Sequence, residues 1–464
     1  MEMKKRRLLA TGAAIAVTVA LAACSPAVNN PNNSTPPPAN STSPGQSSAA
    51  PAAPVQIEFW HRTFTPAEND WYAGIIDKFN AAQTEVKVVG TEVPADAWDQ
   101  KMKAAQAAGN APDIYTHAGP VKEAVDQGQL ADLGTLMPAD LLEQIIPGAR
   151  PFVVVDGKFY GYPLLLEGQE VLWWNKDLLS AAGLDPNKGP ATWSELLDMC
   201  AKIKPTLPDG KYCIAPAQNE IDLAWSSWGQ QWNWNGGHLA LNDKWTEPNV
   251  QTEGYKNMIQ LYKDLWDKGY VAQQPLAGYL EAKDFGPGNV AFKIGGTWMM
   301  SEIGTDYPDM LGKTGMGPVP SSSASNTLPT TTLGDFKWVI DAKAKHPEAA
   351  AKFLSWVLAG DPANLVPFFV NTQFTKVPVR QVVQDAVAKD PAAAAAAWSG
   401  PIMQIIPTGI MQPTYSWDIS VAVGTAIMAG MTGTDSIDGA LATAADAIKT
   451  VIERDDLPNK VPAS

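Results

Sequence analysis

The sequence has few of the residues that usually build metal sites and nucleophilic active sites. Its 464 residues include three cysteines and four scattered histidines. It contains no HExxH zinc motif, no GxSxG nucleophile motif and no CxxC pair. Gly312-Lys313-Thr314 resembles the end of a phosphate-binding Walker A loop, but Tyr307 stands where that loop requires its first glycine. We therefore expect no metal, no cofactor and no enzymatic activity.

Positive charge is also scarce relative to negative charge. The chain has 34 Lys and Arg residues against 48 Asp and Glu residues, which gives a formal net charge of −14. A protein this acidic is repelled by a phosphate backbone. The charge balance therefore argues against binding to nucleic acid.

Length and composition indicate a folded protein with more than one domain. A single ordinary core does not hold 464 residues, so two or three domain-sized units are expected. Hydrophobic residues make up 45% of the chain and charged residues 18%, which is a globular composition. The 17 tryptophans exceed what core filling alone leads us to expect, which suggests a ligand surface rich in aromatic rings.

The N-terminal segment has the pattern of a secretory signal. A basic stretch, Lys4 to Arg7, precedes an apolar stretch, Leu8 to Ala23. This pattern predicts a signal peptide at 1–23, and the alternative is an uncleaved membrane anchor. Leu21-Ala22-Ala23-Cys24 resembles the bacterial lipobox, which implies that Cys24 is lipidated and anchors the protein to the membrane.

The next segment, 24–54, consists almost wholly of small and polar residues and proline. Such a composition cannot offset its ordering entropy, so it predicts a flexible tether. No later stretch is apolar enough and long enough to cross a bilayer. The remaining thiols, Cys200 and Cys213, predict a disulfide in an oxidising compartment, with two separate buried thiols as the alternative.

Strand and helix patterns alternate along the chain after the tether. We expect strands at 55–60, 85–89 and 112–115, with helices at 69–82, 95–108 and 121–127 between and after them. This alternation predicts an α/β fold with a parallel sheet covered by helices on both faces. Later strands are expected at 171–174 and 290–295, and later helices at 193–203, 254–268, 347–358, 378–388, 420–429 and 436–452.

Several short strings occur in a fixed order. They are Ala111-Pro112-Asp113-Ile114, Gly161-Tyr162-Pro163, Leu172-Trp173-Trp174-Asn175-Lys176-Asp177-Leu178, Ala182-Gly183-Leu184, Thr192-Trp193-Ser194-Glu195-Leu196, Asn235-Gly236-Gly237, Ala291 to Trp298, and Lys345 to Ala350. Together they resemble family 1 of the extracellular solute-binding proteins, the maltose-binding-protein type of ABC sugar importers. The resemblance spans roughly Val55 to Arg454.

The resemblance implies a two-lobe α/β fold of the periplasmic-binding-protein type II, with the ligand in the cleft between the lobes. The first lobe would hold 55–166 and 319–359, and the second 167–318 and 360–464. The ligand would lie at the C-terminal ends of the strands. The implied function is capture of a carbohydrate outside the cytoplasm and its delivery to an ABC permease, and we expect a monomer.

Candidate ligand-binding residues are aromatic or polar and lie at the ends of the expected strands and helices. A sugar needs flat aromatic rings against its C–H face and polar groups for its hydroxyls. The first lobe offers Trp60, His61, Arg62, Asp96, Trp98, Thr116 and His117. Trp60 could instead be the last core residue of its strand. A lone histidine is more often structural than functional.

By resemblance, Trp174 and Trp298 match the family's stacking aromatics, and Trp417 lies near a further one. Glu167 lies at the first crossing between the lobes, where a carboxylate could accept hydroxyl hydrogen bonds. Asp335 stands where relatives commonly carry glycine, and it either reads a hydroxyl or is an exposed turn residue. Trp225 and Trp228 come from an aromatic-rich run whose members could equally be core residues.

Two other functions remain as alternatives. Glu167 and Asp335 could form the carboxylate pair of a glycoside hydrolase, since that chemistry needs two acids across a sugar. A surface protein that binds polysaccharide without transporting it would also use many tryptophans, but on an open platform.

Overall fold

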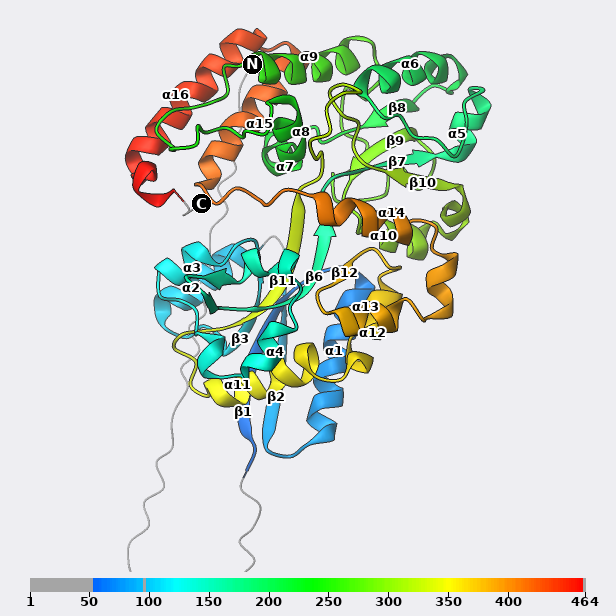
Figure 1. Cartoon of the computed structure of the whole chain (residues 1–464). Coiled ribbons are helices and arrows are strands. Elements are labelled where there is room, and N and C mark those ends of the chain that lie inside the picture. Colours follow the sequence, from blue (N-terminus) through cyan, green and yellow to red (C-terminus); the bar gives the residue numbers. More distant parts are fainter. Residues whose placement is uncertain (1–52, 95–96, 462–464) are drawn as a thin grey trace, which may run out of the picture. The chain divides into compact units, whose positions relative to one another are not determined.

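The computed structural model describes residues 53–94 and 97–461 (Figure 1). The predicted signal peptide, Cys24 and nearly all of the predicted tether lie outside the described residues, and so does Asp96.

The first sheet has six strands in the order β12-β6-β11-β3-β1-β2. Strand β1 (Val55–Arg62) runs parallel to β2 (Val86–Val93) and to β3 (Ile114–Ala118). Strand β11 (Leu333–Ile340) runs antiparallel between β3 and β6 (Tyr162–Gly168), and β12 (Val377–Pro378) adds to the far edge of β6. The α/β fold expected from the sequence is confirmed. The expected parallel sheet is wrong, because β11 comes from the returning chain and runs antiparallel to β3 and β6.

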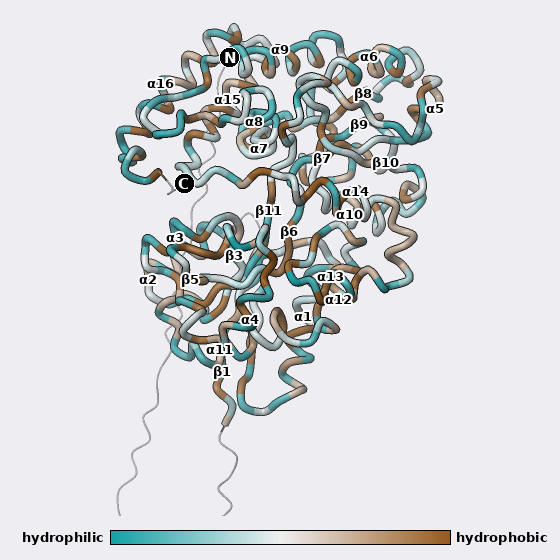
Figure 2. Tube along the Cα trace, in the orientation of Figure 1, coloured by the Kyte–Doolittle hydropathy of each residue, from teal (hydrophilic) through white to brown (hydrophobic). Residues whose placement is uncertain are grey.

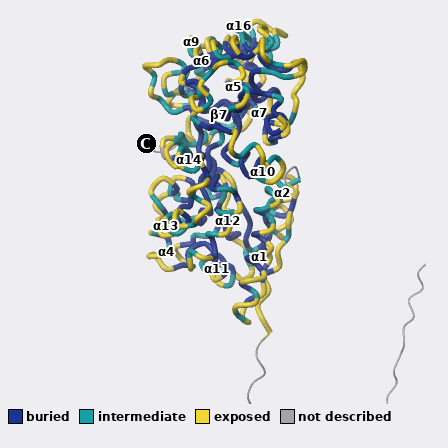
Figure 3. Tube along the Cα trace, turned by 90° about the vertical axis from the view of Figure 1, so that its right-hand side faces the viewer, coloured by how far each residue is buried: buried dark blue, intermediate teal, exposed yellow. Residues whose placement is uncertain are grey.

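Helices α1 (Pro66–Ala82), α11 (Pro347–Leu354) and α12 (Val366–Asn371) pack against this sheet. Large apolar side chains of the helices and the sheet form the contact. Trp71 of α1 contacts Phe368 of α12 with ring centroids 5.0 Å apart. Shorter or more peripheral helices complete the lobe: α2 (Trp98–Ala108), α3 (Lys122–Asp126), α4 (Ala139–Glu143) and α13 (Gln381–Val387). Figure 3 shows the sheet as buried and the outer faces of these helices as exposed.

The second sheet has four strands in the order β10-β7-β9-β8. They are β7 (Val171–Asn175), β8 (Tyr212–Ala215), β9 (Val290–Gly295) and β10 (Thr314–Gly317). The helices of this lobe are α5 (Lys176–Ala181), α6 (Trp193–Ile203), α7 (Glu220–Ser226), α8 (Trp228–Trp234), α9 (Glu253–Asp267), α10 (Met299–Asp306), α15 (Trp417–Thr432) and α16 (Ile437–Asp455).

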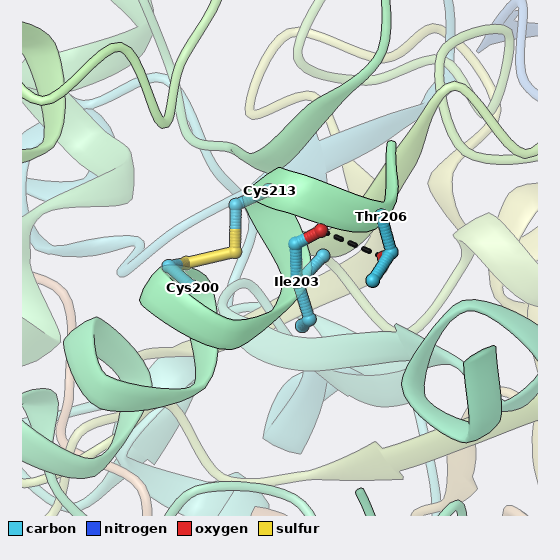
Figure 4. Close-up of a disulfide and its surroundings, with 4 residues drawn as sticks. All are labelled: Cys200, Ile203, Thr206 and Cys213. Carbon is cyan, nitrogen blue, oxygen red and sulfur yellow. Dashed lines mark hydrogen bonds between the residues drawn. A yellow bond between two sulfur atoms is a disulfide. The ribbon is translucent and has the colours of Figure 1, made fainter. Parts of the chain in front are cut away.

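The predicted disulfide is confirmed. Cys200 of α6 and Cys213 of β8 are bonded, with their Cα atoms 5.5 Å apart (Figure 4). Both side chains are buried, so the bond ties helix to sheet inside the core of the second lobe.

The chain passes between the two sheets at three neighbouring segments. Gln169 N donates to Thr332 O at 2.9 Å, and Leu333 N donates to Ile410 O at 2.7 Å. Glu170 accepts from Thr332 N at 2.6 Å and from Thr332 Oγ1 at 3.1 Å. The three crossings are therefore hydrogen-bonded to one another. Figure 2 shows the hydrophobic tube of β6 and β11 leading into this region.

The lobe boundaries expected at 319 and 360 are wrong. Val319 is buried in the core of the second lobe, and the return crossing falls at Thr331 to Leu333. Beyond 360 the chain stays with the first lobe, because β12 pairs with β6 and α12 packs on α1. It returns to the second lobe after Ile410. Between these points lies α14 (Ser399–Ile405).

Among the described residues no single helix is long and apolar enough to span a membrane. One pair of helical segments, Pro347–Ala359 and Pro362–Asn371, is long and apolar enough only when the two segments are taken together. The pair is bent by 89°.

Candidate functional site

The C-terminal ends of β1, β3 and β6 lie together at one edge of the first sheet. Because β1 and β3 are parallel neighbours, Arg62 and Thr116 meet there, and Arg62 N donates to Thr116 Oγ1 at 3.1 Å. Arg62 is half-buried and lies in the field of Asp99 and Glu167, while Thr116 is fully buried. This edge is the strand-end position that open α/β sheets use for ligands.

Glu167 belongs to a buried cluster of three charges at this edge. Lys376, which directly precedes β12, lies 2.6 Å from Glu167 and 3.4 Å from Glu68 of α1. Burial would lower the pKa of Lys376, but the two carboxylates outweigh it and raise that pKa. Glu167 therefore has a permanent cationic partner inside the protein, which the sequence did not indicate.

Asp335 is also paired internally, so both of its expected roles are wrong. It is neither an exposed turn residue nor open to a hydroxyl, because one carboxylate oxygen lies 2.7 Å from Lys337 Nζ and the other accepts from Gly119 N at 3.1 Å. Lys337 Nζ also donates to Gly119 O. His117 faces Lys337 across the β3–β11 pair, and burial, with Lys337 nearby, lowers the pKa of His117 to about 3. His117 is thus a neutral imidazole.

Trp225, Tyr279 and Trp298 form an aromatic platform on the second lobe. The ring centroid of Trp225 lies 6.2 Å from that of Trp298 and 5.1 Å from that of Tyr279. Trp225 and Trp298 are half-buried, and Trp298 Nε1 donates to Leu280 O at 3.3 Å. Trp225 and Trp298 are therefore partly exposed, whereas Tyr279 is buried.

Hydrogen bonds place the aromatic platform beside the charged edge of the first sheet. Tyr279 OH donates to Gln169 O at 3.3 Å. Thr297 N donates to Gly168 O at 2.9 Å. Trp298 directly follows Thr297, and Glu167 directly precedes Gly168, so stacking and polar groups adjoin one another at the first crossing.

Trp228 and Trp417 form a second pair, with ring centroids 6.2 Å apart and rings nearly perpendicular. Trp228 is buried and donates from Nε1 to Ser420 Oγ at 3.1 Å, whereas Trp417 is 44% exposed. Close helix packing fixes this pair, since a Cβ at Gly424 of α15 would lie 2.2 Å from Glu220 O of α7. Trp228 is therefore a supporting residue, and Trp417 can contact a ligand.

The expected stacking role of Trp174 is wrong. Trp174 is 6% exposed, and its Nε1 donates to Pro186 O at 2.9 Å. Its ring covers Gly315, where an added Cβ would lie 2.1 Å from the indole. It lies in the core because β7 is covered on both faces, so that Trp173 and Trp174 are both buried on opposite sides.

The remaining first-lobe candidates are mostly structural. His61 is buried and stacks on Tyr72 with ring centroids 4.5 Å apart, so its predicted ligand contact is wrong. Burial lowers the pKa of His61. Trp60 and Trp98 are half-buried at the edge of a small apolar cluster, and Lys101 Nζ lies 4.5 Å from the Trp60 ring.

The sequence did not reveal a groove of about 730 Å³ that residues of both lobes line. The first lobe contributes Pro120, Lys122, Pro151 and Val154 to Asp156. The second lobe contributes Trp232, Gly237 to Leu239, Leu241 to Asp243, and Trp245. The third crossing contributes Met411 to Tyr415. The aromatic-rich run at 225–234 was the available signal, but helical spacing does not distinguish a groove residue from a core residue. In the described part of the chain, no cluster of three or more potential metal ligands occurs.

Comparison with known proteins gives a family match. Residues 65–361 match the family described as "Bacterial extracellular solute-binding protein". The maltodextrin-binding protein MdxE of Bacillus subtilis is 24% identical over 393 residues, which cover 78% of this chain and 78% of that protein. The sn-glycerol-3-phosphate-binding periplasmic protein UgpB of Brucella abortus is 28% identical over 232 residues, which cover 46% of this chain and 51% of that protein.

Among solved structures, the cyclic alpha-maltosyl-1,6-maltose binding protein from Arthrobacter globiformis is similar over most of the chain. Its TM-score is 0.68 at 25% sequence identity, and the match covers 87% of this chain and 100% of that chain.

Proposed function

The chain belongs to the bacterial extracellular solute-binding proteins, and from this premise we propose that it captures a neutral carbohydrate and delivers it to an ABC permease. The observation that carries the proposal is the aromatic platform of Trp225, Tyr279 and Trp298 beside the polar edge of the first sheet. Flat rings suit the C–H face of a sugar, and the adjoining polar groups suit its hydroxyls.

The charge arrangement at this edge favours a neutral ligand over an anion. The two buried lysines at this edge, Lys376 and Lys337, each have a carboxylate partner within 2.7 Å, and the half-buried Arg62 lies in the field of Asp99 and Glu167. A ligand phosphate would have to compete with those carboxylates, whereas sugar hydroxyls need only hydrogen-bond partners. The relative that binds maltodextrin therefore suggests the ligand better than the relative that binds sn-glycerol-3-phosphate.

The same ion pairs favour binding over hydrolysis. A glycosidase needs one carboxyl group that gives up a proton and one that attacks or activates water. Asp335 is fully buried with both oxygens engaged, and Glu167 is held by Lys376. The two-lobe fold likewise favours a ligand enclosed between lobes over an open adhesive platform.

A thermal-shift screen of the full chain tests the ligand class. Neutral mono- and oligosaccharides should raise the melting temperature, because a ligand that binds only the folded state stabilises it. sn-Glycerol 3-phosphate should leave it unchanged. Stabilisation by the phosphate ester alone would overturn the assignment, and release of reducing ends from an oligosaccharide would replace it with a hydrolase.

The anchoring of the protein is part of the proposal. Members of this family act outside the cytoplasm. We infer that 1–23 is removed and that Cys24 carries the lipid, which holds a monomeric binding protein at the membrane. Mass spectrometry of the mature N-terminal peptide should show a diacylated Cys24, and a Cys24→Ser variant should be released from membranes.

A further inference from the structure

The two most exposed large hydrophobic side chains in the described part of the chain both border the aromatic platform. Ile221 of α7 is 53% exposed, and Leu280 is 51% exposed. Ile221 lies four residues before Trp225, on the same face of α7. Leu280 directly follows Tyr279, and its carbonyl oxygen accepts the hydrogen bond from Trp298 Nε1. An uncovered aliphatic side chain therefore adjoins each partly exposed ring, and we call these two side chains the apolar rim.

The exposure of Leu280 does not come from a loose loop, because hydrogen bonds anchor the chain on both sides of it. Tyr279 OH donates to Gln169 O at 3.3 Å, which ties the residue before Leu280 to the first crossing. Ala282 N, two residues after it, donates to Glu302 Oε2 at 2.9 Å. The leucine side chain is therefore held in solvent from a fixed position.

Ile221 is held just as firmly by its helix. Asn219 caps the start of α7, since its side chain accepts from Asp222 N at 2.8 Å. The helix also packs closely on α15, because a Cβ at Gly424 would lie 2.2 Å from Glu220 O. Single exposed aliphatic side chains are common on protein surfaces. Two that flank a pair of indole rings on fixed backbone extend an apolar surface, and such surfaces mark binding sites.

Negative charge borders the rim. Glu220 and Asp222 are the sequence neighbours of Ile221, and Glu281, which follows the rim leucine, lies 2.8 Å from Lys283. Three carboxylates thus stand beside the rim against one ammonium group. An apolar group that carries a carboxylate or a phosphate would be repelled here. The charges therefore favour an uncharged apolar group as the occupant.

We propose that the apolar rim holds an uncharged apolar aglycone, so that the ligand is a glycoside whose sugar ring lies on the aromatic platform. The proposal rests on the proposed function and names the class of carbohydrate that it serves. The sugar stacks on Trp225 and Trp298, while the aglycone covers Ile221 and Leu280 and removes their side chains from water. Each methylene group that becomes fully buried strengthens binding about fourfold.

Calorimetry on the full chain with glycosides of increasing alkyl length tests the rim. The probes are the methyl, butyl and hexyl glycosides of glucose, galactose and mannose, each as the α and the β anomer. The wild type should bind the hexyl member of at least one series at least about tenfold more tightly than the methyl member, with the butyl member between them. Its heat-capacity change on binding should become more negative with alkyl length, because apolar surface is buried.

Serine substitutions assign the gain to the rim. Ile221→Ser and Leu280→Ser should each lose part of the gain, and the double variant most of it, while affinity for the methyl glycoside stays within about twofold. Both side chains are exposed, so these variants keep the fold. Val382→Ser is the matched control, since Val382 of α13 is 49% exposed on the first lobe. It should keep the full gain.

The outcomes separate the rim from the proposed function. If neutral sugars stabilise the protein in the thermal-shift screen but hexyl glycosides bind no more tightly than methyl glycosides, or none of these probes binds, the rim proposal is overturned and carbohydrate capture stands. A gain that survives in the double variant also overturns it. So does sedimentation of the wild type as a dimer and of the double variant as a monomer, because the rim is then a contact between two copies of the chain. Failure of every neutral sugar in the screen, with stabilisation by sn-glycerol 3-phosphate, overturns both.

Discussion

At the residue scale, the buried charges of this protein differ in whether they have a cationic partner. Glu167 and Asp335 each have a lysine within 2.7 Å, whereas Glu170, at the first crossing, accepts its hydrogen bonds from Thr332. Burial therefore dominates at Glu170 and raises its pKa to about 8. Because its hydrogen bonds join two crossings between the lobes, its proton is coupled to the stability of that junction.

Glu170 should make the protein less stable as pH rises through neutrality. In the unfolded chain its carboxyl group ionises near the ordinary glutamate pKa of 4.5, but in the folded protein it keeps its proton up to about pH 8. A raised pKa means that its contribution to the free energy of unfolding is fully present below about pH 4.5 and is lost towards pH 8. Tyr262 and Tyr279 face it and stay neutral, because burial raises the pKa of each.

Urea denaturation of Glu170→Gln between about pH 5 and pH 9 measures this effect. The amide keeps an acceptor for Thr332 N and cannot ionise, so the variant should lose less stability over this range than the wild type. Glu85→Gln is the control, because Glu85 is exposed and Lys352 lowers its pKa out of this range. Parallel pH profiles for Glu170→Gln and the wild type would contradict the assignment.

Trp298 is the residue whose truncation should most directly weaken binding of a sugar. Trp298→Ala removes a half-exposed ring of the aromatic platform, and loss of such an anchor costs about 2 kcal/mol or more, which is about thirtyfold in affinity. Calorimetry with the best sugar from the screen measures it. Trp356→Ala, a half-buried tryptophan of the first lobe, should bind like the wild type. Unchanged affinity in Trp298→Ala would mean that the platform is misplaced.

At the element scale, the sequence predicted where helices and strands lie better than it predicted which elements pair or pack with one another. Strands β1 and β3 and helices α6 and α9 could be predicted because alternation and helical periodicity are local signals. Strand β8 and strand β10 are only four residues each and carry no alternation of buried and exposed positions, so they were missed. Trp174 was misassigned for a related reason, since a strand buried on both faces gives no sign of which face meets the ligand.

The link between α6 and β8 should supply a measurable part of the stability of the second lobe. Replacing both Cys200 and Cys213 by serine removes the cross-link across a sequence separation of 13 residues. The expected loss is about 3 kcal/mol of unfolding free energy in the chain-entropy view. Urea denaturation with and without reductant checks it: reductant should destabilise the wild type and not the variant. Two free thiols in the unreduced protein would contradict the bond itself.

At the scale of the whole molecule, long-range pairing decides which lobe a segment joins. Helix α12 and strand β12 were expected in the second lobe, yet Val377 pairs with Leu166 and Phe368 packs on Trp71. The local sequence at 360–406 does not indicate these pairing and packing partners, which lie about 200 to 300 residues earlier in the chain. The charged edge and the groove are products of the same long-range pairing, which is why Lys376 and Tyr415 could not be chosen from sequence.

The arrangement of the crossings predicts that ligand binding moves the lobes together. The platform and the charged edge come from different lobes. In the described part of the chain, the segments that pass between them are held side by side by hydrogen bonds, such as Gln169 with Thr332 and Leu333 with Ile410. A ligand that contacts both walls favours the closed state by its difference in affinity for the two states. Small-angle scattering of the full chain should show a smaller radius of gyration with saturating sugar. Trp298→Ala at the same sugar concentration should remain at the larger radius, because it binds weakly. Calorimetry first establishes that the wild type binds the sugar. If the radius of gyration of the wild type then stays unchanged with that sugar, the site is rigid or an open platform, and the proposed coupling between the two walls is wrong.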